Sequence, residues 1–489
     1  MGFHWVDATV VVAYLIAITL FGAHFGKGQK SIHDYFLGGR KLPWWAIAFS
    51  VVSAETSILT IISAPGIAFN SNLAFLQLVL GYLVARVVVA FVLIPRYFAG
   101  EIYTAYQLIE QRFGKNLRIV TASLFLITRA LAEGVRVFAI SIVIEIVLNT
   151  GVFTSVVIIT ALTLFYTYRG GLTAVIWTDV IQFAIYISGT ALALWLALGA
   201  IPGGWAEVTQ IAAAAGDKFS VFNFTWDYDR PYLFWSGLIG GAFLSTASHG
   251  TDQLIVQRLL AARTMRDSQK AVLASGFIVL FQFALFLVVG VVLFAFYSHH
   301  PSAQPFVRSD QVFPRFVVQN LPRGVAGLVV AAIIAAAMAN LSAALNSLAS
   351  SSIVDFYKRF RKTTDDAHDL WASRVVTLFW GGLLILIALL AQFMHQSVLE
   401  LALTIASVPY GCMLGIFLLG VLTRRVSGTA AAAGAVGGLT VLLGFMGLTT
   451  VAWTWYVAIG TVATFVIGLL ASLVIHDETR GSNGEVQRN

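Results

Sequence analysis

Residues 44–69 read WWAIAFSVVSAETSILTIISAPGIAF, an apolar stretch with a polar interruption near its middle. The stretch can cross a hydrocarbon layer about 30 Å thick, because a spanning helix needs roughly 20 residues. Ser53, Glu55, Thr56 and Ser57 form the interruption. An ionisable group at that depth is costly unless it faces a cavity or a partner. The stretch therefore predicts a membrane helix that is broken inside the bilayer.

Residues 232–258 repeat this design, with the sequence YLFWSGLIGGAFLSTASHGTDQLIVQR. Small and polar residues at 245–252 separate two apolar halves. The two broken segments are the first members of two consecutive sets of five apolar segments, at 44–199 and 232–423. Because five is odd, the second set enters the membrane from the opposite side. This pattern predicts an inverted repeat whose broken helices expose backbone carbonyls and helix ends at mid-membrane.

Apolar segments of this kind recur along the whole chain. Of its 489 residues, 58% are hydrophobic and 11% are charged, whereas a soluble domain carries roughly 25% charged residues. The 42 glycines and many alanines fit closely packed helices better than a β-barrel. We predict an all-α polytopic membrane protein with about thirteen transmembrane helices. The predicted spans are 6–26, 44–69, 73–99, 117–147, 151–168, 173–199, 232–258, 271–297, 324–356, 370–393, 397–423, 428–448 and 451–475.

These spans make one transmembrane domain over residues 1–489, without an appended soluble domain. Residues 6–26 are an extra N-terminal helix, which is retained because no clear small-residue cleavage site follows it. Two further helices at 428–475 follow the second repeat, and a polar tail occupies 476–489. The single cysteine, Cys412, lies in an apolar segment, so no intrachain disulfide is possible.

The basic residues predict the orientation of the chain. Most of the 30 Lys and Arg residues fall in loops that are inside when the N-terminus is outside and the C-terminus is cytoplasmic. An odd number of spans also places the termini on opposite sides. The positive-inside rule therefore predicts this orientation in the cell (inner) membrane. The net charge of +7 is a topology signal rather than a sign of a nucleic-acid partner.

Three further spans carry polar groups at bilayer depth. These groups are Arg129, Glu133 and Arg136 in the fourth span, Thr178, Asp179 and Gln182 in the sixth, and Asn340, Ser342, Asn346 and Ser347 in the ninth. The first three lie on one helical face, at spacings of four and three. They either form a structural ladder of ion pairs or contact a substrate. The ninth-span residues either bind a ligand or form simple hydrogen bonds between helices.

Several short motifs occur in the order and spacing of a known family. They are FLGGR at 36–40, QRFG at 111–114, RGGLTAVIWTDVIQ at 169–182, the segment from Gln253 to Arg258, LNS at 345–347 with Asp355, and LGIFLLG at 414–420. On these residues the chain resembles the sodium:solute symporter family over nearly its whole length. The resemblance implies sodium-coupled transport by alternating access. It also implies a thirteen-helix, LeuT-like fold with a 5+5 inverted repeat, in agreement with the hydropathy.

The resemblance also implies a sodium site. The family's main-chain carbonyl ligands fall on Phe49, Val52 and Ala336. Its two adjacent hydroxyl residues fall on Ala339 and Asn340, which is a departure from the pattern. Sodium is a hard cation that prefers oxygen ligands, and an alanine side chain supplies none. The amide oxygen of Asn340 remains a candidate ligand.

Some family members hold a second sodium ion, and the resemblance carries this site over only in part. Its aspartate falls on Asp179 and one of its hydroxyls on Ser342, whereas Ala343 does not match. Sodium coupling is the leading interpretation, and uncoupled transport is an alternative. A second alternative is proton coupling through Glu55, Glu133 or His249.

By the same resemblance the substrate lies between the two breaks. The candidate contacts are Glu55, Thr56, Gln77, Arg136, Ser245, Ser248 and His249. Sugar-carrying members of the family stack the sugar ring on an aromatic residue beside the second break, where Ser248 and His249 stand in this chain. We therefore expect a small polar or anionic organic solute rather than a hexose.

Other classes of protein are weaker interpretations. A membrane-embedded enzyme could use the charged residues for acid–base chemistry, but the sequence has no spacing such as His-Glu-x-x-His. A channel would need a continuous water-lined path, and a transporter-like sensor would need a signalling partner. We expect no cofactor beyond Na⁺ as the coupling ion. The sequence does not predict the oligomeric state.

Overall fold

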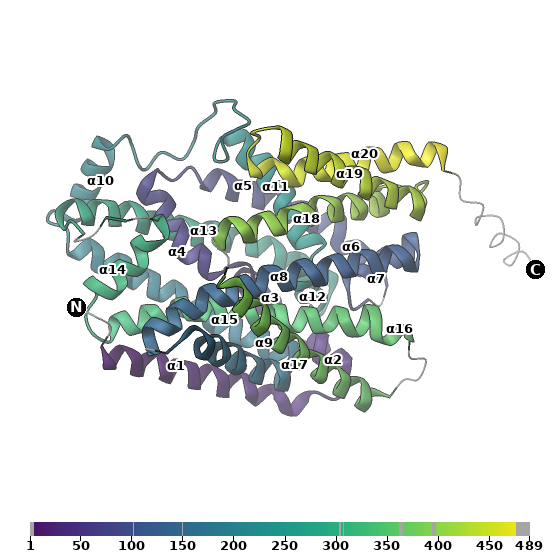
Figure 1. Cartoon of the computed structure of the whole chain (residues 1–489), viewed down its shortest axis with the longest axis horizontal. Coiled ribbons are helices and arrows are strands. Elements are labelled where there is room, and N and C mark those ends of the chain that lie inside the picture. The colour runs from purple at the N-terminus through teal and green to yellow at the C-terminus, as the bar shows by residue number, and fades with distance from the viewer. Residues whose placement is uncertain are drawn as a thin grey trace, which may run out of the picture.

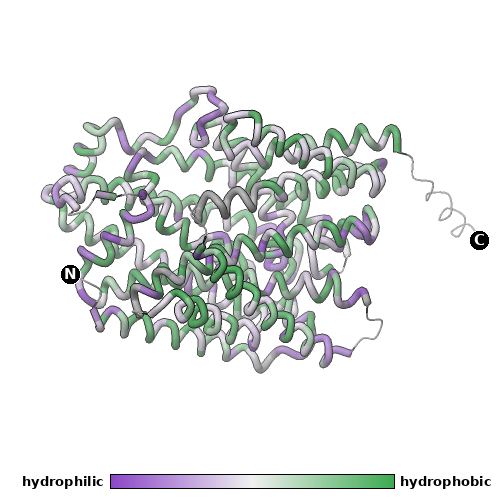
Figure 2. Tube along the Cα trace, viewed as in Figure 1, coloured by the Kyte–Doolittle hydropathy of each residue, from purple (hydrophilic) through white to green (hydrophobic). Residues whose placement is uncertain are grey.

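The computed structural model describes residues 4–100, 102–148, 150–302, 305–306, 308–360, 365–393 and 398–475. Long helices dominate this part of the chain and run side by side along the longest axis of the molecule (Figure 1). Hydrophobic residues cover the middle of these helices, and hydrophilic residues gather toward the two ends (Figure 2). The predicted tail at 476–489 lies outside the described residues.

The helices of the first half are α1 (Trp5–His24), α2 (Ile32–Leu37), α3 (Trp44–Glu55), α4 (Ile58–Asn70), α5 (Leu76–Val88), α6 (Ile94–Tyr97), α7 (Ala105–Phe113), α8 (Lys115–Leu148), α9 (Val152–Gly199) and α10 (Gly204–Ala214). Those of the second half are α11 (Phe234–Gly250), α12 (Gln253–Leu260), α13 (Met265–His299), α14 (Val312–Asn320), α15 (Val325–Ser351), α16 (Lys358–Phe360), α17 (Asp366–Ala391), α18 (Val398–Leu422), α19 (Gly428–Leu448) and α20 (Tyr456–Val474). Two π-helical turns, η3 (Val89–Leu93) and η5 (Ser352–Tyr357), join α5 to α6 and α15 to α16.

The chain is a multi-pass membrane protein. Among the described residues, 8 helices are long and apolar enough to cross a membrane, or 9 when the bent pair α3–α4 counts as one span. Helix α9 has 48 residues and therefore measures about 72 Å, more than twice the thickness of a hydrocarbon core. It is kinked at Gly171, where φ is 52° and ψ is −150°. The predicted spans 151–168 and 173–199 lie on the two sides of this kink.

Glycine is required at that kink for two reasons. Its positive φ lies in a region that favours glycine. A Cβ atom on Gly171 would also lie 2.5 Å from the backbone oxygen of Tyr35. The kink at Gly171, the last residue of the RGG motif, therefore packs against the short helix α2.

The first predicted break is present in the structure. Helices α3 and α4 meet at an angle of 69°. Thr56 has the extended values φ −78° and ψ 108°, and it ends α3. Ser57 begins the next helix as its N-cap, because its hydroxyl accepts the backbone N–H of Thr60 at 3.4 Å.

The second predicted break is also present, at the far end of the polar stretch. Helix α11 continues through Ser245 and His249 and ends at Gly250. Asp252 has extended backbone angles and caps α12, since its Oδ1 accepts the N–H of Leu254 at 2.9 Å. The interruption therefore falls at Thr251 and Asp252, and the preceding polar residues keep a helical backbone.

Helix α15 lies at the centre of the bundle, and nearly all residues of its membrane-spanning part are buried. Its many alanines allow α9 and α1 to pack closely against it. Asp7 on α1 caps the first turn of α15, because the Oδ1 atom of Asp7 accepts the N–H groups of Gly324 at 2.6 Å and Gly327 at 2.9 Å. A carboxylate at this position satisfies free N–H groups and complements the helix dipole.

The loop between α10 and α11 is tied to α4, the second half of the first broken helix. Lys218 is buried in this loop, and its Nζ donates to the backbone oxygens of Phe69 at 2.7 Å and Ser71 at 3.0 Å. The ammonium also lies 4.0 Å from the ring centroid of Phe294. Burial lowers the pKa of Lys218 below its usual value. This lysine caps the C-terminal end of α4.

Candidate transport site

A cavity of about 240 Å³ lies between the two breaks, and we call it the central cavity. Its wall combines the α3–α4 junction with residues of α8, α11, α13, α15 and α18. It brings together the predicted substrate contacts Glu55, Thr56, Arg136, Ser245, Ser248 and His249. The interrupted helices thus enclose a polar space inside the membrane-spanning bundle.

Gln77 is the predicted contact that does not line this cavity. Its side chain is buried, and its Nε2 donates to the backbone oxygens of Ala74 at 3.2 Å and Tyr232 at 3.1 Å. Its Oε1 accepts the N–H of Asn223 at 3.0 Å. Gln77 therefore holds the loop between α10 and α11 against the start of α5.

Glu55 belongs to an ion cluster at the end of α3. Its Oε2 lies 2.7 Å from Nη2 of Arg86 and 3.4 Å from Nε2 of His249. Arg86 also donates to Ser245, and from Nε to Ser275 at 3.2 Å. The guanidinium is buried, whereas the Glu55 side chain is 19% exposed. Arg86 on α5 therefore neutralises the carboxylate at the first break, and His249 links this carboxylate to α11.

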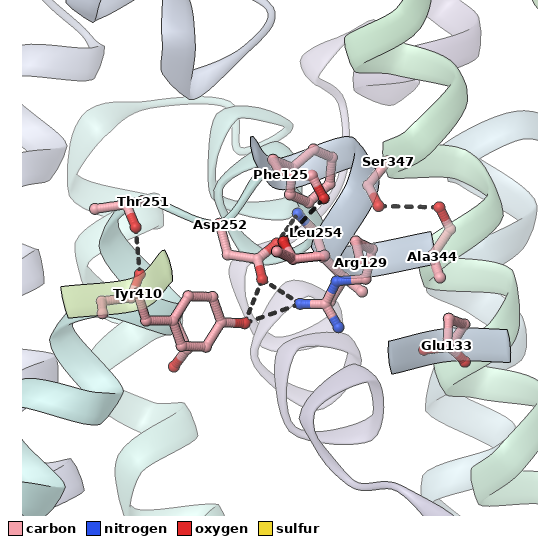
Figure 3. A network of polar contacts seen from close by, with 12 residues as sticks. Phe125, Arg129, Glu133, Thr251, Asp252, Leu254, Ala344, Ser347 and Tyr410 are labelled. Atoms are coloured by element: carbon pink, nitrogen blue, oxygen red, sulfur yellow. Dashed lines mark hydrogen bonds and ion pairs between the residues drawn. The ribbon is translucent and has the colours of Figure 1, made fainter. Parts of the chain in front are cut away.

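A second cluster closes the other side of the cavity (Figure 3). Arg129 on α8 forms an ion pair with Asp252 at the second break. The Tyr410 hydroxyl on α18 donates to Oδ2 of Asp252 at 2.5 Å and accepts from Arg129 at 3.1 Å. No hydrogen bond or ion pair joins Arg129 to Glu133 in this view or elsewhere in the described chain. The arginine therefore joins α8 to the α11–α12 break rather than forming a ladder along α8.

Arg136 forms longer polar contacts than Arg129, the other arginine that lines the central cavity. Its Nη1 lies 3.2 Å from Glu133 and 3.4 Å from Oδ1 of Asn340. Its Nε has no hydrogen-bond partner among the described residues. The side chain is 21% exposed, compared with 10% for Arg129. Arg136 thus keeps unused donor capacity at the central cavity.

The predicted ligands of the first sodium site lie on neighbouring helices, because α3 packs against α15. Phe49 precedes Val52 on α3, and Ala336 precedes Asn340 on α15. The Val52 oxygen accepts the N–H and the hydroxyl of Thr56, at 2.9 and 2.7 Å. Asn340 donates from Nδ2 to the backbone oxygen of Ala54 at 2.5 Å. The amide therefore links α15 to the C-terminal end of α3.

The predicted ligands of the second site have other contacts in this structure. Asp179 forms an ion pair with Arg258 at 3.0 Å, and both side chains are 0% exposed. The Ser50 hydroxyl donates to the same carboxylate at 2.5 Å. The Ser342 hydroxyl donates to the backbone oxygen of Ala339 at 3.0 Å. Oδ1 of Asp179 has no hydrogen-bond partner among the described residues.

Polar contacts also connect Thr56 to residues that the sequence did not single out. The Gln282 side chain donates from Nε2 to the Thr56 hydroxyl at 2.8 Å and accepts the Tyr186 hydroxyl at 2.8 Å. These residues come from α13 and α9. The backbone at the first break is therefore held by two further helices.

Sequence reasoning missed Arg86, Gln282 and Tyr410 as parts of the site. Arg86 lies within a predicted span, and Arg258 at the end of another, where a basic side chain commonly reaches the interface. Each of these two arginines has its carboxylate partner on another span, so no local spacing in the sequence marks either pair. The available signal was charge balance, because a buried Glu55 or Asp179 requires a cation nearby.

The fold and the site define a class of protein. Two interrupted helices meet inside a membrane-spanning bundle, and polar side chains from several helices face an enclosed cavity at their breaks. Secondary transporters bind solute and coupling ions in this way. Among the described residues, no group of three or more His, Cys, Asp or Glu side chains could hold a metal ion.

The chain belongs to the sodium:solute symporter family, whose model matches residues 35–438. It is a sodium-coupled solute symporter and not an enzyme, as the motifs predicted. It is 28% identical over 480 residues to the sodium/sialic acid symporter NanT of Aliivibrio fischeri, covering 96% of this chain and 94% of NanT. It is 27% identical over 438 residues to human sodium-coupled monocarboxylate transporter 1, covering 87% and 70% of the two chains.

A solved structure extends the similarity to three dimensions. That structure is a substrate-bound, outward-open state of a Na⁺-coupled sialic acid symporter. The two chains have a TM-score of 0.88 and 26% sequence identity, and the match covers 97% of this chain and 98% of the other. The similarity therefore includes the whole arrangement of helices and not a local motif.

Proposed function

We propose that this protein carries a small organic anion into the cell together with Na⁺, and that Arg136 binds the anionic group. The incomplete pairing of Arg136 is the observation that carries this proposal. Every other charged side chain in the central cavity has a close ionic partner, whereas Arg136 has long contacts and an unpaired Nε. A carboxylate of the solute would supply the missing acceptors.

The rest of the cavity wall is consistent with a small solute that has an apolar body. Phe75, Tyr82, Phe283 and Trp453 line the cavity beside the polar cluster. Two of the related proteins are named as carriers of sialic acid and of monocarboxylates. Both substrates carry a carboxylate, which agrees with the charge of Arg136. The cavity of about 240 Å³ has room for a small carboxylate of this kind.

Na⁺ as the coupling ion would bind near Phe49, Val52, Ala336 and Asn340, with Asp179 and Ser342 as candidates for a second ion. In this structure Asn340 contacts Arg136, and Asp179 contacts Arg258. Ion binding at these oxygens therefore requires the guanidinium groups to turn away or to share them. Proton coupling is the second candidate, because Glu55 and His249 lie 3.4 Å apart at the cavity.

Thirteen spans in the order of a 5+5 inverted repeat also form part of the proposal. The remaining predicted spans coincide with α8 and α11–α12, which carry charged and polar residues of the site, and with α18, whose apolar segment is Val408–Leu422. Counting α9 as two spans supports the proposed order. The positive-inside rule supports an external N-terminus and a cytoplasmic C-terminus.

Uptake into proteoliposomes tests the proposal. We expect Na⁺ to drive uptake of a monocarboxylate such as lactate or pyruvate, and we expect no uptake of the corresponding neutral amide. Choline replaces Na⁺ at fixed pH to test the ion. The Arg136→Gln variant should lose about tenfold or more in kcat/KM, because it loses one charge-assisted contact.

The Arg266→Gln variant serves as the matched control, since it removes an exposed arginine outside the central cavity. Equal uptake of acid and amide, or full activity of Arg136→Gln, would overturn the substrate assignment. Undiminished uptake in choline would overturn sodium coupling. A proton gradient that drives uptake in choline would favour the Glu55–His249 alternative.

A further inference from the structure

A second cavity of about 340 Å³ lies at the end of the bundle where α7, α8 and α16 meet. Its charged lining residues are Glu110, Lys115, Arg118, Asp355, Lys358 and Arg359. It shares no lining residue with the central cavity. Four cationic side chains against two carboxylates give this cavity an excess of positive charge.

Both carboxylates in this cavity are already engaged. Asp355 accepts Nε of Arg118 at 2.8 Å, the Thr104 hydroxyl at 2.7 Å and the Ser351 hydroxyl at 2.8 Å. Glu110 forms an ion pair with the same arginine. One guanidinium therefore contacts both carboxylates of the cavity and links α7, α8 and η5.

Within the described part of the chain, one of the three remaining basic residues is paired with a carboxylate and two are not. Lys358 forms an ion pair with Asp369 at 3.1 Å. Lys115 and Arg359 are exposed and have no ion pair or side-chain hydrogen bond among the described residues. Two free cations from different helices therefore face one concave site.

The start of α8 adds to this positive field. Lys115 is the first residue of a helix of 34 residues, and its first turn holds no acidic residue. The N–H groups of residues 115–117 have no acceptor among the described residues. A helix N-terminus carries a partial positive charge, so a lysine there is electrostatically unfavourable unless an anion lies nearby.

We propose that this cavity binds a phosphate group, held by Lys115 and Arg359 at the N-terminus of α8. A phosphate offers several acceptor oxygens and matches both the guanidinium and the free N–H groups. Its source is either the head group of an anionic phospholipid or a soluble phosphate compound. The cavity lies where the span Val325–Tyr357 ends, at the level that lipid head groups reach.

The occupied site would act on the transport machinery through α7. The segment that leads into α7 is held to α12, because Gln253 accepts the N–H of Ala105 at 2.9 Å and donates to the oxygen of Tyr103 at 2.9 Å. Tyr103 also lines the phosphate cavity. A bound phosphate therefore stabilises the contact between α7 and the second broken helix.

Thermal unfolding of the purified full chain tests this site, with tryptophan fluorescence as the readout. One arm adds inorganic phosphate in neutral detergent, with chloride at matched sodium concentration and ionic strength as reference. The other arm compares nanodiscs of phosphatidylcholine with nanodiscs that also contain phosphatidylglycerol. A ligand that binds the folded state raises the unfolding midpoint.

We expect one of the two arms to raise the midpoint of the parent protein, and the responding arm identifies the source. The Lys115→Gln/Arg359→Gln variant should lose this rise or need about tenfold more phosphate. The Arg266→Gln/Arg425→Gln variant removes the same charge from exposed residues elsewhere and should keep it. Without phosphate, the first variant should be at least as stable as the parent, since it removes a lysine from a helix N-terminus.

The proposal is overturned if neither arm raises the midpoint of the parent, or if both double variants respond alike. A first variant that is much less stable than the parent without any anion also contradicts it, because the two side chains would then have a structural role. Failure of organic-anion uptake does not bear on this test, since the central cavity is not involved.

Discussion

The ion pair between Asp179 and Arg258 can be tested by removing each partner separately and then both together. Both side chains are fully buried, and the pair joins α9 to α12. Removing one member of a buried ion pair costs about 3–5 kcal/mol, because the other charge stays buried without compensation. We expect this loss of stability in Asp179→Asn and in Arg258→Met. The double variant Asp179→Asn/Arg258→Met should regain most of it.

Unfolding by heat, followed by the fluorescence of the 12 tryptophans, measures these differences. The coupling energy between the two sites should be several kcal/mol, in the range for residues in direct contact or above it. Ser50 and Leu254 also contact Arg258, and both contacts are lost in Arg258→Met. We therefore expect Arg258→Met to be less stable than Asp179→Asn.

Transport separates the structural role of Asp179 from a role in ion binding. If Asp179 binds Na⁺, the double variant regains stability but requires more Na⁺ for half-maximal uptake. If the carboxylate only holds Arg258, the double variant regains both properties. The reasoning is refuted if Asp179→Asn is as stable as the parent, or if the losses of the single variants add up in the double variant.

Two further predictions concern the fold. Replacing Asp7 with Ala removes the carboxylate that caps α15 and should lower the free energy of unfolding by about 1–2 kcal/mol. The Asp7→Asn variant should lose less stability. Equal stability of Asp7→Ala and the parent protein would contradict the capping role. Replacing Gly171 with Ala should cost at least about 1–3 kcal/mol, because of its positive φ and the contact of 2.5 Å with Tyr35. Gly382→Ala is the control, since its Cβ would meet nothing within 4 Å, and alanine is the better helix former there by about 1 kcal/mol.

The sequence predicted the two broken helices because their interruptions are local. Ser57 and Asp252 are polar residues that start a new helix, and each is followed by an apolar run. The kink at Gly171 fell between two predicted spans for the same reason. Hydropathy and capping residues act over a few residues, so a sequence shows them directly.

The partners inside the site could not be predicted in this way. Glu55 and Arg86 lie on different helices, as do Asp179 and Arg258, and only packing brings them together. Gln77 was expected in the pocket because the family resemblance places a substrate contact at its position, yet backbone groups satisfy it. A polar residue in a span indicates a buried partner but does not say whether that partner is a ligand or the protein itself.

Lys218 offers a way to follow the first broken helix from outside the membrane. Since its ammonium holds the end of α4 through backbone oxygens, a displacement of that end pulls the loop along. Ala215, three residues away, is exposed, while the single native thiol of Cys412 is buried. A fluorophore attached to a cysteine at position 215 would therefore label one site selectively and report the opening and closing of the carrier in real time.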